Sequence, residues 1–500
     1  MCPAAKGWII GATRRTSMTT SRWMPKWMHD RDTDEFSPVP TRVVSNEEYL
    51  PLPQTREQQR VALALREMSG RHSRRLGVSR RDFLGSSAGM AAAFLAFNAV
   101  FGRIFDVDPV EALEPAATDA RTPAGQFVFD IQTHHVAAPR QFPGLLELRK
   151  LGRQWNPLLD KDRGTMDELY LANYIREIFL DSDTTVAVIS GIPSATDETN
   201  ILPPGEMART RDVVNRLAAS QRVVAHGLVA PNKGARDLDE MKRQSEQYKI
   251  GAWKGYTGIS FGSPPAPWRV DDEKVAYPML EASRRLGVKN ICLHKGLPFQ
   301  GTDPQSWHPR DIERAAQDFP DLNFIVYHSA FLSLRPWIGA GPERFEPPAR
   351  VDWVTDLCEI RRRNPKLTNI YAELGSTFGM MVITAPMLCG HVLGMLIQAL
   401  GADHVLWGTD SIWWGSPRWQ IEAFRRFTMP EPLQARFGYR ALTPDVKTQI
   451  LGLNAARLYG IDPGGHRNPV PPDFVSKLKA AYLDEGPRPS LTQYGWVLES

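Results

Sequence analysis

The sequence predicts an α/β protein built on a (β/α)₈ TIM barrel over residues 126–460. Eight short apolar runs alternate with segments of helical periodicity across this range, which fits one barrel better than a doubly wound sheet. Several of these runs end in His or Asp, the pattern of buried parallel strands that carry a site at their carboxyl ends. No GxGxxG or Walker motif follows any of them, which argues against a nucleotide-binding fold.

The individual elements are predicted from the change between continuous apolar runs and apolar residues at helical spacing. Gly287 and Gly401 directly follow two of the helical segments, as expected just past a helix end. The predicted strands are 126–131, 185–190, 222–228, 250–256, 289–294, 323–328, 369–373 and 404–409. The predicted helices include 207–219, 238–248, 273–286, 309–318, 352–363 and 386–400.

The chain outside the predicted barrel divides into three parts. Residues 1–78 are rich in Arg, Met, Ser and Pro with little periodicity, so we expect a disordered leader or a start site placed too early. Residues 79–112 begin Ser-Arg-Arg-Asp-Phe-Leu and continue into an Ala-rich apolar stretch, which resembles a twin-arginine export signal. A cleaved signal, an uncleaved anchor and a membrane-surface helix are the alternatives. Residues 461–500 form a Pro-rich tail.

Composition and charge limit the classes of partner. The 500 residues are 42% hydrophobic and 23% charged with a net charge of +4, which is typical of a globular protein. No basic stripe with interleaved aromatic residues is present, so we expect no nucleic-acid partner. Beyond Cys2 in the leader, the cysteines at 292, 358 and 389 are too few and too widely spaced for a disulfide framework, and we expect buried thiols.

The candidate site consists of the polar residues at the predicted strand ends. Gln132 and His134 follow the first strand on one strand face, and His294 ends the fifth strand. His328 ends the sixth strand, and Asp410 follows the eighth. Imidazole and carboxylate groups delivered to one face of a barrel predict a divalent metal, since Zn²⁺ and its neighbours prefer these ligands.

Five phrases at these positions resemble the amidohydrolase-related family, which includes aminocarboxymuconate-semialdehyde decarboxylase, resorcylate-type decarboxylases and hydrolases. The phrases are DIQTHH (130–135), CLHKG (292–296), VYHSA (326–330), WGTDSIWW (407–414) and ILGLNAARLYG (450–460). The resemblance covers residues 126–460 and implies that the last phrase is structural. In that family the first strand normally ends in His-x-His, so Gln132 is a departure that offers a neutral amide oxygen in place of imidazole.

The resemblance also implies a role for each site residue. It implies that His134, His294 and Asp410, with Gln132 in the remaining ligand place, hold one divalent ion, which is Zn, Mn or Fe. It implies that Asp410 also holds the attacking water and that His328 is the catalytic acid or base. Further substrate contacts are expected from Lys254, Glu373, Trp413 and Trp414.

The predicted function is a metal-dependent hydrolase of a small aromatic or cyclic amide, ester or lactone. A metal-dependent decarboxylase of an aromatic or enoic acid is the main alternative, and a degenerate barrel that binds a ligand without turnover is the third. We expect a small-molecule substrate, a periplasmic location through the twin-arginine route, contact with the membrane only through that signal, and a homodimer as one oligomeric alternative.

Overall fold

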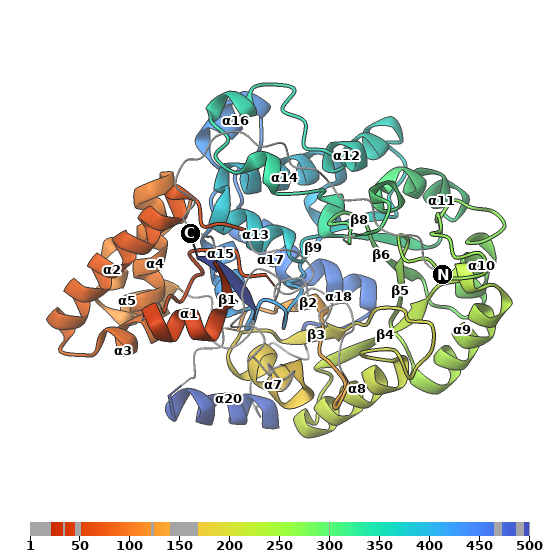
Figure 1. Cartoon of the computed structure of the whole chain (residues 1–500), viewed down its shortest axis with the longest axis horizontal. Coiled ribbons are helices and arrows are strands. Elements are labelled where there is room, and N and C mark those ends of the chain that lie inside the picture. Colours follow the sequence, from red (N-terminus) through yellow and green to blue (C-terminus); the bar gives the residue numbers. More distant parts are fainter. Residues whose placement is uncertain are drawn as a thin grey trace.

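The computed structural model confirms the predicted barrel (Figure 1). It describes residues 22–33, 36–45, 52–121, 125–140, 169–299, 301–464, 473–486 and 495–499. Eight strands in this part of the chain pair in sequence order, every pair parallel. They are β2 (Phe129–Thr133), β3 (Val186–Ile189), β4 (Val223–Val229), β5 (Ala252–Tyr256), β6 (Asn290–His294), β7 (Asn323–Tyr327), β8 (Ile370–Glu373) and β9 (Val405–Leu406).

The barrel closes between its first and last strands beyond the end of β9. Asp410 N–H donates to the carbonyl of Gln132 at 2.9 Å, and His134 N–H donates to the carbonyl of Ser411 at 2.6 Å. A parallel bridge joins Thr133 to Ser411. Because this closure runs through Gln132, His134 and Asp410 themselves, the backbone hydrogen bonds of the barrel fix the spacing of the candidate site.

The predicted helices form the outer layer, with boundaries that differ by a few residues. The helix α14 matches its prediction, while α8 starts earlier because Pro204 occupies the first helical position, where no N–H is needed. The helices of the barrel layer include α8 (Pro204–Ala218), α9 (Ala235–Tyr248), α10 (Tyr277–Arg285), α11 (Ile312–Asp318), α12 (Val354–Arg363), α13 (Thr377–Thr384), α14 (Pro386–Leu400), α15 (Arg418–Arg426) and α18 (Asn454–Tyr459).

The ILGLNAARLYG phrase has the structural role that its resemblance implied. Asn454, the first residue of α18, donates from Nδ2 to the carbonyls of Ala402 and Val405, both at 2.8 Å. Gly452 lies so close to the first strand segment that a Cβ atom there would be 2.4 Å from the carbonyl oxygen of Phe127. The phrase therefore connects α18 to β9, the last strand of the barrel, and to the segment that leads into β2, the first strand.

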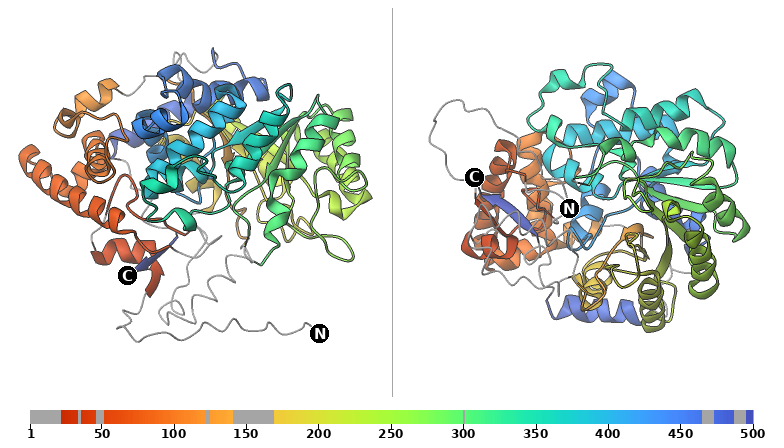
Figure 2. Two further views of the ribbon diagram at one scale, coloured as in Figure 1. Left: turned by 90° about the horizontal axis from the view of Figure 1, so that it is seen from above. Right: turned by 45° about the vertical axis from the view of Figure 1, so that its right-hand side comes forward.

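Residues 22–33, 36–45 and 52–78, which belong to the expected leader, are folded against the barrel. The other residues of that leader, 1–21, 34–35 and 46–51, lie outside the described part. Figures 1 and 2 show the N-terminal module beside the barrel. Its main helix α2 buries one face, and Gln58 on that face donates to the carbonyl of Ile383 in the barrel layer. The module contains β1 (Arg22–Pro25), α1 (Lys26–Thr33), α2 (Arg56–Leu76), α3 (Arg80–Gly85), α4 (Ser87–Phe101) and α5 (Pro115–Arg121).

The Ala-rich segment expected to be an export signal forms the buried helix α4. Phe94 and Phe97 are fully buried, and the ring of Phe94 packs against that of Phe105 with 4.6 Å between centroids. Phe105 in turn pairs with Phe427 at the end of α15. Among the helices described, none is both long and apolar enough to cross a bilayer.

The described parts of the C-terminal tail contact both the barrel and the N-terminal module. Helix α20 (Phe474–Asp484) is held at its start by Asp473, which forms an ion pair with Arg222 at 2.7 Å. Strand β10 (Trp496–Glu499) pairs antiparallel with β1. The two ends of the described chain therefore form one small sheet.

Candidate active site

The residues that the sequence singled out lie together at the carboxyl ends of the barrel strands. His294 and Glu373 are the last residues of β6 and β8, and His328 directly follows β7. The group comprises Gln132, His134, His294, His328, Glu373 and Asp410, each at most 3% exposed. Such burial means that every polar atom here needs a specific partner.

The backbone is strained at three of these strand ends. His328, Ser376 and Asp410 have φ angles of 62°, 55° and 63°. Residues with side chains avoid this region, and strained residues of this kind cluster at functional sites, where the surrounding structure holds them in place. The strain thus falls at the strand ends on which the predicted catalytic residues lie.

Asp410 is the centre of a hydrogen-bonded cluster. Gln132 Nε2 donates to its Oδ1 at 2.9 Å, and His134 Nε2 lies 3.0 Å from the same oxygen. Ser376 Oγ donates to Oδ2. Burial acts to raise the pKa of Asp410, but the contacts with His134 and Ser376 and the nearby charge of His328 hold it at about 2. Asp410 is therefore a carboxylate at neutral pH.

His294 and His328 form a second pair. His328 Nε2 lies 3.2 Å from His294 Nδ1, and His328 Nδ1 donates to the carbonyl of Gly375 at 2.8 Å. Burial lowers the pKa of His328 to about 4 and lowers the pKa of His294 well below its usual value. Both imidazoles are therefore neutral at pH 7, and His328 can accept a proton at Nε2.

The hydrogen bonding of His134 indicates a place for a cation. Its Nδ1 lies 2.8 Å from the carbonyl oxygen of Ser190, and a carbonyl only accepts, so Nδ1 carries the proton. In the neutral ring Nε2 is then an acceptor, yet it faces the Asp410 oxygen at 3.0 Å. Two acceptors at this distance repel each other unless a proton or a metal cation lies between them. A metal-bound histidine usually donates its other N–H to a carbonyl in this way.

The donor atoms fit a divalent metal in their chemistry but do not form a complete ligand set. Among the described residues, no three His, Cys, Asp or Glu side chains stand close enough together to hold an ion. The predicted ligands are instead divided between the His134–Asp410 pair and the His294–His328 pair. Gln132 Oε1 is buried without a hydrogen-bond partner in the described part. A half-turn of the Gln132 amide group would exchange its oxygen and nitrogen and bring Oε1 to the side of Asp410.

Glu373 holds the backbone of the site. Its carboxyl oxygens accept from the N–H groups of His328, at 3.0 Å, and of Gly375. Burial raises the pKa of Glu373 to about 8, so it is largely protonated at pH 7. A Cβ atom at Gly408 would lie 1.8 Å from Glu373 Oε1, which explains the glycine of the WGTD phrase. Glu373 thus holds the backbone of His328 in place, while its expected contact with substrate stays a prediction.

Lys254 lies inside the barrel and is completely buried. Its Nζ is 3.2 Å from the ring centroid of Tyr327 and 5.0 Å from that of Tyr256, so aromatic faces stabilise the ammonium. Its charge contributes to the lowered pKa values of His294 and His328. The residue therefore makes the floor of the site electropositive.

Aromatic side chains cover the histidines. Trp413 stacks on His134 with 5.8 Å between ring centroids, and Tyr256 stacks on His294 at 4.8 Å. Trp414, from which a substrate contact is expected, donates from Nε1 to Ser376 Oγ at 2.8 Å. Ser376 was missed in the sequence, where a serine three residues after a predicted strand carried no motif.

Two other histidines, His226 and His135, are buried and have partners outside the candidate site. His226 contacts Ser190 Oγ and the hydroxyl of Tyr459, at 3.1 and 2.9 Å. His135 points away from the site toward Thr210, with 2.8 Å between Nε2 and Oγ1.

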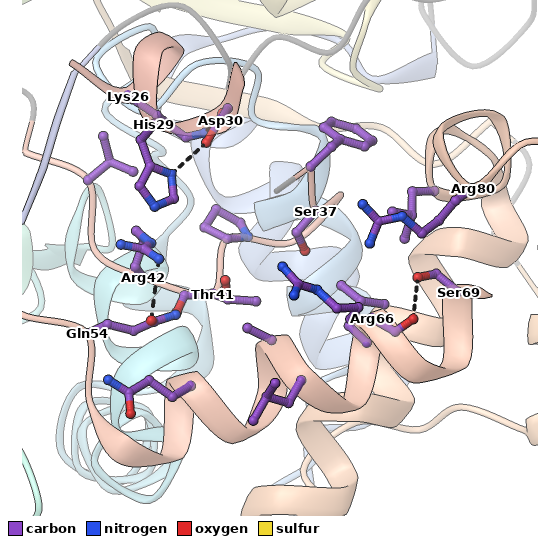
Figure 3. A pocket seen from close by; sticks show the side chains of 18 residues that line it. Lys26, His29, Asp30, Ser37, Thr41, Arg42, Gln54, Arg66, Ser69 and Arg80 are labelled. Carbon is purple, nitrogen blue, oxygen red and sulfur yellow. Dashed lines mark hydrogen bonds and ion pairs between the residues drawn. The ribbon is translucent and has the colours of Figure 1, made fainter. Parts of the chain in front are cut away.

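A separate cavity of about 340 Å³ lies in the N-terminal module. It is lined by α1, α2, α3 and residues 36–44, with no residue from the barrel strands. Figure 3 shows Arg42, Arg66 and Arg80 around it. It is not part of the candidate active site.

The fold and site define a parallel eight-stranded barrel with buried His and Asp side chains at the carboxyl ends of its strands. This chain belongs to the amidohydrolase family, whose model matches residues 195–461, more than half of the sequence. The match begins after β3, so Gln132 and His134 precede it. No curated protein matches the chain.

Solved structures with similarity to the chain include three decarboxylases. They are 2,6-dihydroxybenzoate decarboxylase from Rhizobium (14% identity, covering 67% of this chain and 99% of that chain, TM-score 0.39), 5-carboxyvanillate decarboxylase from Sphingomonas paucimobilis (15%, 67% and 100%, 0.40) and dihydroxybenzoic acid decarboxylase from Polaromonas sp. JS666 with bound manganese (14%, 67% and 97%, 0.39). These identities and scores are too low to carry an argument about the reaction.

Proposed function

We propose that this chain is a metal-dependent hydrolase of a small aromatic or cyclic amide, ester or lactone. The observation that carries the proposal is the 3.0 Å approach of His134 Nε2 to Asp410 Oδ1, a pair of acceptors that a proton or a metal cation between them would stabilise. His134 and Asp410 would hold one divalent ion, Zn, Mn or Fe, with His294 and the Gln132 amide oxygen as further ligands. Such an ion would lower the pKa of a water bound to it, so that a nucleophile is available at neutral pH.

The residues of the chain orient that water and move its protons. Ser376 and Gln132 fix the carboxylate of Asp410, so Asp410 can orient the water and accept its proton. His328 is fixed through Nδ1–H by the carbonyl of Gly375, so its unprotonated Nε2 can first accept a proton from the water and then transfer it to the leaving group. Burial of these groups excludes bulk water and strengthens each electrostatic contact.

The walls of the site support a flat substrate. Trp413 and Tyr256 present aromatic rings beside His134 and His294, which suits an aromatic or cyclic compound. The buried charge of Lys254 favours a substrate that carries a negative group.

Decarboxylation of an aromatic or enoic acid is the second candidate. The charge of Lys254 below the site favours it, because a carboxylate is the group that this reaction removes. A panel of aryl esters, lactones and hydroxylated benzoic acids separates the two reactions, with product analysis for hydrolysis and CO₂ release for decarboxylation. Ligand binding without either product would instead support a non-catalytic barrel.

Metal analysis of purified protein tests the proposal directly. We expect about one divalent ion per chain. Asp410→Asn or His294→Ala should each remove most of the ion. Metal affinity should fall by more than the roughly 10–100-fold that is typical when a residue that only orients a metal ligand is changed. His328→Ala should retain the ion while turnover falls by about 10²-fold or more. His404→Ala, a histidine away from these strand ends, is the control. Full occupancy in both ligand variants would refute the assignment.

We also propose export by the twin-arginine route, supported by the Ser-Arg-Arg-Asp-Phe-Leu phrase at 79–84. Arg80→Lys with Arg81→Lys keeps both charges but removes the paired arginines, so the protein should stay folded in the cytoplasm. Fractionation with a periplasmic marker measures this, and an unchanged periplasmic or membrane yield would contradict it.

A further inference from the structure

The turn between α2 and α3 exposes two aliphatic side chains at an extremity of the molecule. Leu76 and Val78 are 39% and 45% exposed, on either side of Gly77. Figures 1 and 2 both show this turn at the outer edge of the N-terminal module, on the side away from the barrel. A flat partner could therefore touch the turn without meeting the rest of the described chain.

The turn is held rigidly by its backbone. Gly77 has a φ of 69°, and its N–H donates to the carbonyl of Arg74, while Val78 N–H donates to that of Ser73 at 3.0 Å. This is a Schellman motif, in which the residue after the glycine usually packs on the residue that accepts its N–H. Here that residue is the polar Ser73, which provides no apolar surface, so Val78 is directed outward in a fixed position.

Arginine side chains surround the two aliphatic residues. Arg71, Arg74, Arg75 and Arg81 are exposed, and residues 71–81 contain no Asp or Glu. Throughout the described part of the chain, none of these four arginines forms an ion pair, whereas exposed arginines of the barrel layer such as Arg209, Arg284 and Arg363 do. The tip thus combines apolar side chains with positive charge that the fold does not neutralise.

We propose that this tip docks the protein on the surface of an anionic phospholipid membrane. The arginines match anionic headgroups, and Leu76 and Val78 are placed to enter the apolar boundary below them. The apolar helix α4 cannot serve this purpose, because its apolar residues are buried against the module and the barrel. The proposal concerns a surface outside the barrel and does not depend on the proposed reaction.

Sedimentation of the full-length protein with vesicles tests the proposal. The protein should bind vesicles of phosphatidylcholine mixed with phosphatidylglycerol, bind pure phosphatidylcholine weakly, and release as salt rises. Arg74→Glu with Arg75→Glu should weaken binding by at least about tenfold. Leu76→Ser with Val78→Ser should also weaken it, and a thermal melt should show that both variants stay folded.

Matched changes elsewhere provide the controls. Arg236→Glu with Lys242→Glu makes the same change of net charge on exposed residues of α9, and Leu217→Ser removes another exposed leucine, 43% exposed on α8. Both should leave vesicle binding unchanged. Equal binding to neutral vesicles, equal losses in the control variants, or capture of nucleic acid in place of vesicles would each overturn the proposal.

Discussion

Replacement of Ser376 tests whether the cluster around Asp410 is held by a hydroxyl on a strained backbone. Ser376→Ala removes the hydrogen bond to Asp410 Oδ2 while keeping the φ angle of 55°. Hydrogen bonds to charged groups contribute roughly 1.5–3 kcal/mol, so the free energy of unfolding should fall by about 2 kcal/mol. Ser376→Gly removes the same bond but tolerates the positive φ, and relief of strain should make it about 1 kcal/mol more stable than the alanine variant.

Urea unfolding at pH 7 measures both differences, and metal analysis measures the effect on the site. Asp410 would lose one of the contacts that fix it, so metal affinity should fall about 10–100-fold in both variants. An alanine variant as stable as the parent would show that the hydroxyl contributes nothing. A glycine variant less stable than the alanine variant would show that the backbone at Ser376 is not strained.

Three further predictions concern other parts of the fold and site. Gly408→Ala should cost about 2–4 kcal/mol of unfolding free energy in a urea titration, because the new Cβ displaces the carboxyl of Glu373; Gly85→Ala, with open space at its Cβ, should change it little. Burial raises the pKa of Asp237 to about 6, above its unfolded value, so this carboxyl favours the folded state when protonated, and stability decreases as pH rises from about 4 to 6. Relative to the parent, the free energy of unfolding of Asp237→Asn should therefore rise by on the order of 2–3 kcal/mol between pH 4 and pH 7. The same difference between variant and parent at both pH values would contradict this. Gln132→His should tighten zinc binding in a chelator competition, since nitrogen donors suit zinc better than an amide oxygen, and unchanged affinity would mean that residue 132 does not face the metal.

The alternation of apolar runs and helical spacing was sufficient to predict the barrel. Strands buried on both faces read as continuous apolar runs, so each of the eight could be located within a few residues. Parallel strands of a barrel place their carboxyl ends at one face, and this rule predicted that His294, His328 and Asp410 lie near one another. Boundaries were less accurate, as at β9, where only Val405–Leu406 pair as a strand.

The N-terminal module could not be predicted in the same way. Its composition suggested a leader followed by an export signal, because Arg-rich and Ala-rich segments have similar sequences whether they are exposed or packed. Only tertiary contacts, such as Gln58 with Ile383 and Phe105 with Phe427, cover the apolar faces of α2 and α4.

By itself, the sequence determined the residue types at the strand ends, including Gln132 at a place where the family resemblance implies a histidine. The tertiary structure alone decided how those side chains pair, His134 with Asp410 and His294 with His328, and it added Ser376 to the first pair. The physical reason is that strand periodicity specifies the face on which a side chain lies. Hydrogen bonds between side chains of different strands depend instead on barrel closure, local backbone strain and the proton on each imidazole nitrogen.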